Sequence, residues 1–166
     1  MIQRPRGTRD FGPQEMAERR RVEQAMRDVC LRAGFGEVVT PTFEHSELFT
    51  LRSGQAVVDE MYVFRDKGDR EMALRPEITA SVIRFYVNEL SNSPKPLKLY
   101  YVGNCFRYEN PQSGRFREFF QLGAEIIGSK NAETDAESVA LAVNCIRASG
   151  LKDYKVRIGH IGILKS

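Results

Sequence analysis

Residues 97–127 read LKLYYVGNCFRYENPQSGRFREFFQLGAEII, and this stretch decides the fold. Two long runs, Leu97 to Glu109 and Arg117 to Ile127, are separated by a short connection at 110–114 that contains proline and glycine. Strands turn successive side chains to opposite faces, and proline and glycine mark the turns between strands. The stretch therefore predicts a long antiparallel hairpin.

The two faces of the second strand differ in composition. The apolar positions share one face and suit a core, at Phe120, Leu122, Ala124 and Ile126. The opposite face carries an aromatic ring, an amide, a glycine and a carboxylate, at Phe119, Gln121, Gly123 and Glu125. On the first strand, Arg107 and Glu109 share a face, opposite Phe106 and Tyr108.

This mixed face allows two interpretations. An ordinary solvated face explains the charges, but it does not explain the aromatic ring and the glycine between them. A platform for a flat, anionic ligand explains more, because Gly123 would let the ligand approach the backbone and Phe119 would offer a stacking surface. Arg107 would pair with phosphate oxygens, and a carboxylate would bind a cationic amine. Both interpretations stay open on the pattern alone.

Two further segments fit an anion site. Segment 74–80, LRPEITA, places Glu77 at a predicted turn from strand to helix. Glu77 or Thr79 could equally cap that helix. Arg115 and Arg117 lie in or beside the hairpin connection, where two cations suit a polyphosphate but also serve solubility.

The remaining sequence predicts helices and short strands around the hairpin. One helix begins at Pro13 and ends at Gly34, and a second runs from Ile78 to Leu90. A third is capped by Asn131 or Thr134 and ends at Gly150. Shorter strands are predicted at Glu37–Val39, Met61–Arg65, Glu71–Leu74 and Lys155–Ile158. This order predicts an α+β fold in which an antiparallel sheet is backed by helices.

The composition is that of one ordinary globular domain. The chain has 166 residues, of which 42% are hydrophobic and 28% charged, and its net charge of +3 says little about nucleic acid. No apolar run approaches the roughly 20 residues of a membrane span, so we expect a cytoplasmic protein. The widely spaced cysteines predict buried, reduced thiols rather than a zinc site or disulfides, at Cys30, Cys105 and Cys145. The isolated His45 and His160 predict packing or surface roles.

The motifs of the hairpin resemble motif 2 of class II aminoacyl-tRNA synthetases, in the form found in the histidyl-tRNA synthetase family. The matching segments are FRYENPQ (106–112), GRFREF (114–119) and QLGAE (121–125) within a motif at about 97–128. Elsewhere, RGTRD (6–10) is similar to the family's opening segment, about 13–44 resembles motif 1, and 74–80 resembles the amino-acid loop. Ile78 departs from the glycine of many members and narrows that loop slightly.

The resemblance implies a class II synthetase-like antiparallel β-sheet flanked by helices, of which residues 1–166 form an incomplete, N-terminal portion of the catalytic domain. It also implies roles for single residues. Arg107 would be catalytic, bound to the ATP α-phosphate and the substrate carboxylate. Glu109 would contact the adenine amino group, Phe119 would stack on the adenine ring, and Arg115 would reach the outer phosphates. Histidine would be held by Glu77, Thr79, Arg107, Gln121 and Glu125.

The implied activity is that of a histidine–tRNA ligase. The carboxylate of L-histidine would attack the α-phosphorus of ATP and release pyrophosphate, and the terminal adenosine of tRNA-His would then accept the histidyl group. Mg²⁺ would arrive with the ATP phosphates and not at a metal site of the protein. A homodimer through the motif 1 region is also implied. The family's motif 3 and anticodon-binding domain do not occur in residues 1–166, so we expect these residues alone not to charge tRNA.

Three other functions stay open. The nearest is a non-catalytic paralogue of the synthetase that regulates an ATP phosphoribosyltransferase in histidine biosynthesis. The complete adenylate site implied by Glu77, Arg107, Glu109 and Gln121 favours the synthetase over this regulator. Another class II synthetase, for proline, threonine or glycine, is the second. A plain nucleic-acid-binding domain is the third, but it predicts a basic stripe without the acidic Glu77 and Glu125.

Overall fold

The computed structural model describes residues 1–51, 55–110 and 114–159. Its helices are α1 (Pro13–Arg32), α2 (Glu47–Thr50), α3 (Gln55–Asp59), α4 (Thr79–Phe85), the π-helix η1 (Tyr86–Leu90) and α5 (Ala132–Ala148). Its strands are β1 (Gly36–Glu37), β2 (Phe43–His45), β3 (Val63–Arg65), β4 (Glu71–Leu74), β5 (Leu97–Phe106) and β6 (Glu118–Ile127). Residues 111–113 of the hairpin connection, and His160, lie outside the described residues.

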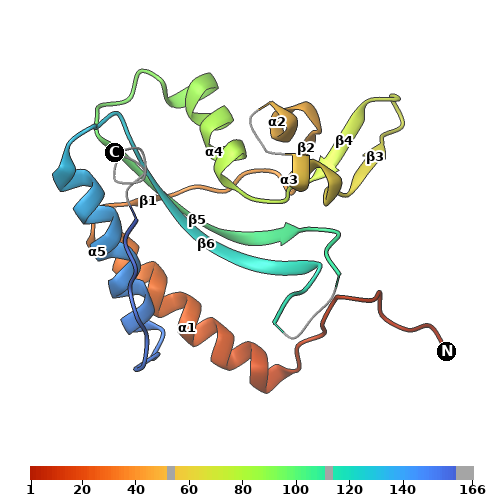
Figure 1. The fold of residues 1–166 in the computed structure, drawn as a ribbon, viewed down its shortest axis with the longest axis horizontal. Coiled ribbons are helices and arrows are strands. Elements are labelled where there is room, and N and C mark those ends of the chain that lie inside the picture. The colour runs from red at the N-terminus through yellow and green to blue at the C-terminus, as the bar shows by residue number, and fades with distance from the viewer. Residues whose placement is uncertain (52–54, 111–113, 160–166) are drawn as a thin grey trace.

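Two three-stranded sheets form the framework of the fold (Figure 1). In the larger sheet β5 and β6 are antiparallel along their whole length, with Leu97 opposite Ile127 and Phe106 opposite Glu118. The short β1 adds to β5 in parallel, a pairing that the sequence did not indicate. The smaller sheet has the order β2-β4-β3 and is antiparallel throughout. The α+β architecture and the long hairpin are therefore confirmed.

Helices α1 and α5 cover one face of the larger sheet (Figure 1). The buried side chains of this layer are Cys30, Phe35, Tyr100, Leu141 and Cys145. Leu122, Ala124 and Ile126 of β6 pack against them, as the alternating pattern predicted. Burial of each large apolar side chain stabilises the fold by about 1.5–3 kcal/mol, so this layer fixes which face of the hairpin turns inward.

The opposite face of the sheet packs on α4. Its buried side chains are Ile78, Val82, Leu99, Tyr101 and Cys105, with Phe119 and Ile127 of β6 packed against them. The smaller sheet and the short helix α2 lie beyond α4 and enclose a third group, formed by Phe49, Met61 and Ala73 (Figure 1). The mixed face of the hairpin therefore faces the start of α4 and not solvent alone.

Two expectations need correction. Phe120 is 45% exposed and does not join the core; it lies opposite Asn104 near the connection of the hairpin, where the Arg19 guanidinium lies 3.0 Å from its ring centre and no buried apolar cluster of the described residues reaches it. Of the two caps that the sequence offered for α5, the structure has Asn131 as the N-cap residue, so that alternative is confirmed. Residues 155–158 are not a strand; Val156 and Ile158 are exposed, and no strand pairs with this segment within the described part of the chain. A strand needs a partner for its backbone hydrogen bonds, which alternation alone does not supply.

Other expectations are confirmed. All three cysteines are buried and have free thiols, and His45 is exposed. The helix that begins at Pro13 is α1, and the Glu15 carboxylate accepts the Gly12 backbone N–H at its start. After α1 the chain turns at Gly34, where φ is +80°, a conformation that L side chains rarely adopt.

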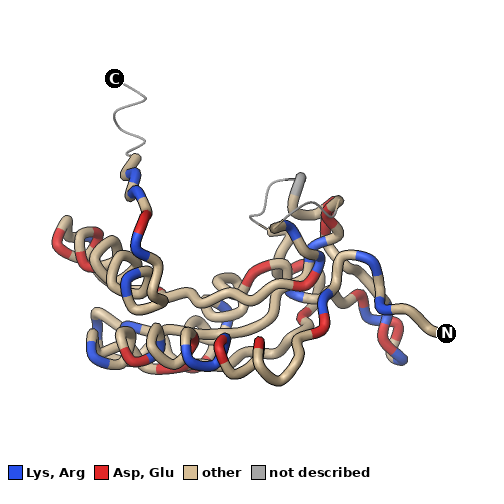
Figure 2. The backbone as a smooth tube through the Cα atoms, turned by 90° about the horizontal axis from the view of Figure 1, so that it is seen from below, with Lys and Arg blue, Asp and Glu red and all other residues tan. Residues whose placement is uncertain are grey.

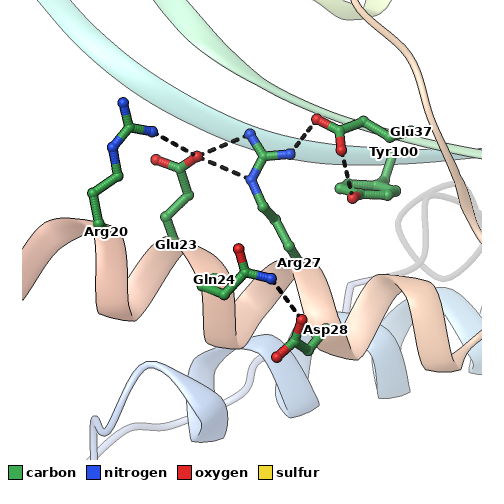
Figure 3. Close-up of polar contacts among 7 residues, drawn as sticks. All are labelled: Arg20, Glu23, Gln24, Arg27, Asp28, Glu37 and Tyr100. Atoms are coloured by element: carbon green, nitrogen blue, oxygen red, sulfur yellow. Dashed lines mark hydrogen bonds and ion pairs between the residues drawn. The ribbon is translucent and has the colours of Figure 1, made fainter.

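Polar contacts fasten α1 to the larger sheet (Figure 3). Arg27 pairs with Glu23 on its own helix at 2.8 Å and with Glu37 on β1. Tyr100 of β5 donates its hydroxyl proton to the other oxygen of Glu37 at 2.9 Å. Glu37 thus receives hydrogen bonds from two separate elements, and Arg27 holds the pKa of its carboxyl below the usual range.

We expect this network to make the fold sensitive to acid. A carboxyl whose pKa is lower in the folded state stabilises the protein above its unfolded pKa, and this stabilisation disappears as the pH falls through the folded value. The melting temperature should therefore drop below about pH 4.3, and Glu37→Gln should remove part of that dependence. Thermal melts from pH 3 to 7 measure it, with the exposed Glu18→Gln on α1 as the control. Identical pH profiles for Glu37→Gln and the unmodified protein would contradict the assignment.

Candidate active site

Arg107 directly follows β5, where the hairpin leaves the sheet. Its backbone N–H donates to the Arg117 carbonyl at 2.9 Å, so the two arms of the hairpin are still paired at this point. The side-chain Nε donates to the Pro76 carbonyl at 2.9 Å, and the guanidinium lies 5.2 Å from the centre of the Phe119 ring. The side chain is 34% exposed. Arg107 is therefore anchored through one nitrogen, and its terminal nitrogens are left for the oxygens of an anion.

Glu109 lies between two arginines. Its carboxylate oxygens are 4.0 Å from Nη1 of Arg107 and 3.7 Å from Nη1 of Arg115. Its backbone carbonyl accepts a hydrogen bond from Nε of Arg117 at 3.1 Å. The two ion pairs are long compared with a normal charged hydrogen bond, so both guanidinium groups keep the capacity to bind another anion. Arg115, with 69% of its side chain exposed, is the outermost member of this group.

Glu77 lies at the start of α4. Its Oε1 accepts the backbone N–H of Ala80 at 2.8 Å, so the capping interpretation of Glu77 is correct for one of its two oxygens. The segment before α4 is fixed at the same time, because the Pro76 carbonyl accepts from Arg107. The hairpin end and the start of α4 are thereby joined through adjacent residues.

Thr79, Tyr101 and Glu125 form a chain of hydrogen bonds across three elements. Thr79 Oγ1 and the Tyr101 hydroxyl are 3.1 Å apart, and the same hydroxyl donates to Glu125 Oε1 at 3.1 Å. Burial raises the pKa of Tyr101, and the carboxylate of Glu125 acts in the same direction. Thr79, the first residue of α4, and Glu125, near the C-terminal end of β6, are thus both hydrogen-bonded to Tyr101 of β5.

Gln121 is held by a buried thiol. The Cys105 side chain is fully buried and donates to Oε1 of Gln121 at 3.2 Å. Burial raises the pKa of this thiol to about 11, so it stays protonated and can act only as a weak donor at neutral pH. The amide nitrogen of Gln121 therefore points away from Cys105.

The glycines of the hairpin make room for side chains, which corrects the expectation for Gly123. A Cβ at Gly123 would overlap the ring and hydroxyl of Tyr101, and a Cβ at Gly103 would overlap the Arg75 guanidinium. The space over Gly123 is therefore filled by the protein and is not open to a ligand. Sequence reasoning missed Tyr101, although a register in which Leu97 faces Ile127 would have set it opposite Gly123.

The predicted site residues fall into two neighbouring groups on one face of the hairpin. The group at the hairpin end consists of Arg107, Glu109, Arg115 and Phe119, and the group around the start of α4 consists of Glu77, Thr79, Gln121 and Glu125. A cavity of about 700 Å³ lies on the opposite face, between α1 and β6, with Phe11, Arg19 and Phe120 in its wall. Of the predicted site residues, Phe119 and Gln121 also border this cavity, whereas Arg107 and Glu125 do not. We place the candidate site on the face toward α4, because the polar side chains converge there.

Metal-binding clusters and membrane-spanning helices are absent from the described residues. Within residues 1–51, 55–110 and 114–159, no group of three or more His, Cys, Asp or Glu side chains could hold a metal ion. Over the same ranges, no helix has both the length and the apolar character needed to cross a bilayer.

The fold and the site define the class of protein. A long antiparallel hairpin is followed by an arginine, and a short parallel strand extends its sheet at the β5 edge. Helices α1 and α5 cover one face of this sheet, and the start of α4 faces the other. This fold is found in solved structures of class II aminoacyl-tRNA synthetases. The family model described as histidyl-tRNA synthetase matches residues 7–166, and the chain belongs to that family.

Individual relatives agree with this assignment. The histidine–tRNA ligase of Methanosphaerula palustris is 57% identical over 165 residues, which cover 99% of this chain and 40% of that protein. A solved structure from Bacillus halodurans, described as an ATP phosphoribosyltransferase regulatory subunit/histidyl-tRNA synthetase, has a TM-score of 0.90 at 30% identity and covers 99% of this chain and 42% of its own. The apo histidyl-tRNA synthetase of S. aureus has a TM-score of 0.77 at 38% identity over 92% of this chain and 36% of its own. The chain thus spans about 40% of the length of the curated relatives it matches.

Proposed function

We propose that the full-length protein is a cytoplasmic histidine–tRNA ligase, and that residues 1–166 supply part of its active site. The observation that carries this proposal is the convergence of Arg107, Phe119 and Glu109 at the hairpin end with Glu77 at the start of α4. A guanidinium beside an aromatic ring suits a nucleotide, and carboxylates nearby suit an amino acid's ammonium group. The two substrates of amino-acid activation would meet at Arg107.

Arg107 would act by positioning and charge stabilisation. Its Nε is occupied by the Pro76 carbonyl, so its terminal nitrogens would contact the α-phosphate and the substrate carboxylate. Negative charge grows on the phosphate oxygens when the carboxylate attacks the α-phosphorus, and a fixed cation stabilises that charge. Pyrophosphate would leave on the side of the exposed Arg115.

The remaining ATP contacts follow from the same group. Phe119 would stack on the adenine ring, and Glu109 would accept a hydrogen bond from its amino group. The Arg107 guanidinium lies 5.2 Å from the centre of the Phe119 ring, so the stacked adenine would lie beside it. Mg²⁺ would be held by the phosphates, where oxygen ligands of the kind it prefers are supplied by ATP itself.

The second group would bind histidine. Glu77, Thr79 and Glu125 offer oxygens that accept hydrogen bonds, and Gln121 offers an amide. Glu77 keeps one carboxylate oxygen that the α4 cap does not use. This set matches the ammonium group of histidine and the N–H of its neutral imidazole, which donate, while the amide of Gln121 can also donate to an acceptor.

Amino-acid-dependent ATP–pyrophosphate exchange by the full-length protein tests the proposal. We expect exchange with histidine and none with proline, threonine or glycine. Charging of tRNA-His should follow in the same preparation. Exchange with a different amino acid would identify another class II synthetase, and no exchange with any amino acid would overturn the ligase assignment.

A regulatory subunit of an ATP phosphoribosyltransferase is the second candidate. The Bacillus halodurans protein, whose structure has a TM-score of 0.90 to this chain, carries the name of that regulator together with the name of the synthetase. A regulator has no need of the adenylate contacts of Arg107 and Glu109. It would give no exchange, and it would instead raise the activity of the phosphoribosyltransferase when the two proteins are mixed.

A homodimer is part of the proposal, and exposed apolar side chains support it. Val39 and Phe43, both within the segment that resembles motif 1, are 83% and 53% exposed. Sedimentation of the full-length protein tests this association. A plain nucleic-acid-binding domain has less support, since acidic and basic residues alternate along the part of the chain drawn in Figure 2 without a stripe of one sign.

A further inference from the structure

Tyr101 lies beneath the proposed amino-acid site and belongs to neither group of predicted residues. It is 3% exposed, and its ring crosses Gly123 on the facing strand. Its hydroxyl contacts Thr79 on α4 and Glu125 on β6, each at 3.1 Å. One buried hydroxyl thus connects two side chains that come from different elements and lie at the same site.

The direction of these hydrogen bonds follows from the chemistry of the three groups. An ionised carboxylate only accepts, so the single proton of the Tyr101 hydroxyl points to Glu125. The remaining contact then requires Thr79 to donate its own proton to the Tyr101 oxygen. Because burial raises the pKa of Tyr101, the phenol remains protonated at neutral pH and this order is kept.

This order decides what the site can offer to a ligand. Thr79 has used its only proton, so its oxygen can act only as an acceptor. Glu125 has one oxygen bonded to Tyr101, while Oε2 takes no hydrogen bond from any described residue. Two acceptors therefore remain at fixed positions, which matches a ligand rich in N–H donors and disfavours one that brings oxygens.

We propose that Tyr101 is a positioning residue of the amino-acid site. Its hydroxyl orients the Glu125 carboxylate and makes Thr79 a hydrogen-bond acceptor for the N–H groups of the substrate. This inference rests on the proposed function, because it takes the substrate to be an amino acid bound by Thr79 and Glu125. Gly123 belongs to the same arrangement, since a Cβ there would displace the ring.

Tyr101→Phe in the full-length protein tests the inference, because it removes the hydroxyl and keeps the ring over Gly123. Thr79 is then free to rotate its proton toward the ligand, and Glu125 loses its fixed orientation. We expect KM for histidine in the exchange reaction to rise about tenfold, with little change in KM for ATP. A purely structural loss would change both constants or lower the amount of folded enzyme.

Tyr100→Phe is the matched control. Tyr100 is the neighbouring residue on β5, is equally buried, and donates its hydroxyl to a carboxylate, Glu37, on the opposite face of the sheet. Its substitution should leave both KM values unchanged. A normal KM for histidine in Tyr101→Phe, with exchange present in the unmodified protein, would overturn the inference.

A stability measurement separates failure of the inference from failure of the proposed function. If the unmodified protein shows no histidine-dependent exchange, the ligase proposal fails. The hydrogen bond between Tyr101 and Glu125 is then tested by comparing the melting temperatures of Tyr101→Phe, Glu125→Gln and the double variant with that of the unmodified protein. If Tyr101 orients Glu125, the double variant should lose less than the sum of the single losses. Additive losses would overturn the positioning role.

Discussion

Replacement of Arg107 by alanine is expected to lower histidine-dependent ATP–pyrophosphate exchange by a factor of about 100 or more, the usual cost of losing one preorganised transition-state donor. The loss should appear mainly in kcat, because the cation acts most strongly when charge develops on the α-phosphate. Arg107→Lys should restore little of the activity, because an ammonium group cannot bond the Pro76 carbonyl and two substrate oxygens in the planar geometry of the guanidinium.

Arg65→Ala is the control for this experiment. Arg65 is the last residue of β3, is 62% exposed and pairs with Asp69 at the β3–β4 turn. Arg65→Ala therefore removes one positive charge, as Arg107→Ala does, but changes no contact of the candidate site. Exchange rates are measured with the full-length protein, and circular dichroism checks that each variant is folded. Near-normal exchange in Arg107→Ala would remove Arg107 from the active site.

Arg75→Leu is expected to reduce the free energy of unfolding by about 3–5 kcal/mol. Arg75 is 6% exposed, and its guanidinium donates to the carbonyls of Asn104 at 2.7 Å, Thr40 at 2.9 Å and Pro41 at 3.2 Å. The variant would leave these carbonyls buried without their donor. Its backbone also bonds Thr42 and Phe106, so this residue joins the smaller sheet to the larger one.

Hydrogen exchange of the β4 and β5 amides in the full-length protein measures this effect where it arises. Protection of these amides should fall strongly in Arg75→Leu. Arg65→Leu should leave it unchanged, because Arg65 bonds only exposed groups at a hairpin turn. Unchanged protection in Arg75→Leu would show that the guanidinium does not hold the two sheets together.

Much of the fold could be predicted because its signals are local. Period-two alternation and a proline- and glycine-containing connection gave the β5–β6 hairpin, and helical spacing between Pro13 and Gly34 gave α1. The same alternation put Leu122, Ala124 and Ile126 in the core. It failed at Phe120, because the pattern specifies a face but not whether another element covers that position.

The residues of the candidate site were proposed from sequence, but the contacts between them could not be. Alternation along a strand predicted to reach Glu109 placed Arg107 and Glu109 on one face; β5 ends at Phe106, but Nη1 of Arg107 and Oε1 of Glu109 are still 4.0 Å apart. Nothing local indicates that Arg107 bonds the Pro76 carbonyl, or that Arg75 fills the space over Gly103. These contacts join residues about thirty positions apart, and their existence depends on how two sheets pack.

The sequence by itself determined the hairpin, the long helices α1 and α5 and the family, since each follows from period, turn chemistry or motif order; it did not indicate the short helices α2 and α3. Tertiary structure alone decided how the residues of the candidate site are used. It placed Tyr101 over Gly123 and between Thr79 and Glu125, and so set which groups can donate and which can accept. The physical reason is that a hydrogen bond needs its partners within about 3 Å, and only the packing of α4 against the β5–β6 hairpin brings these three residues so close.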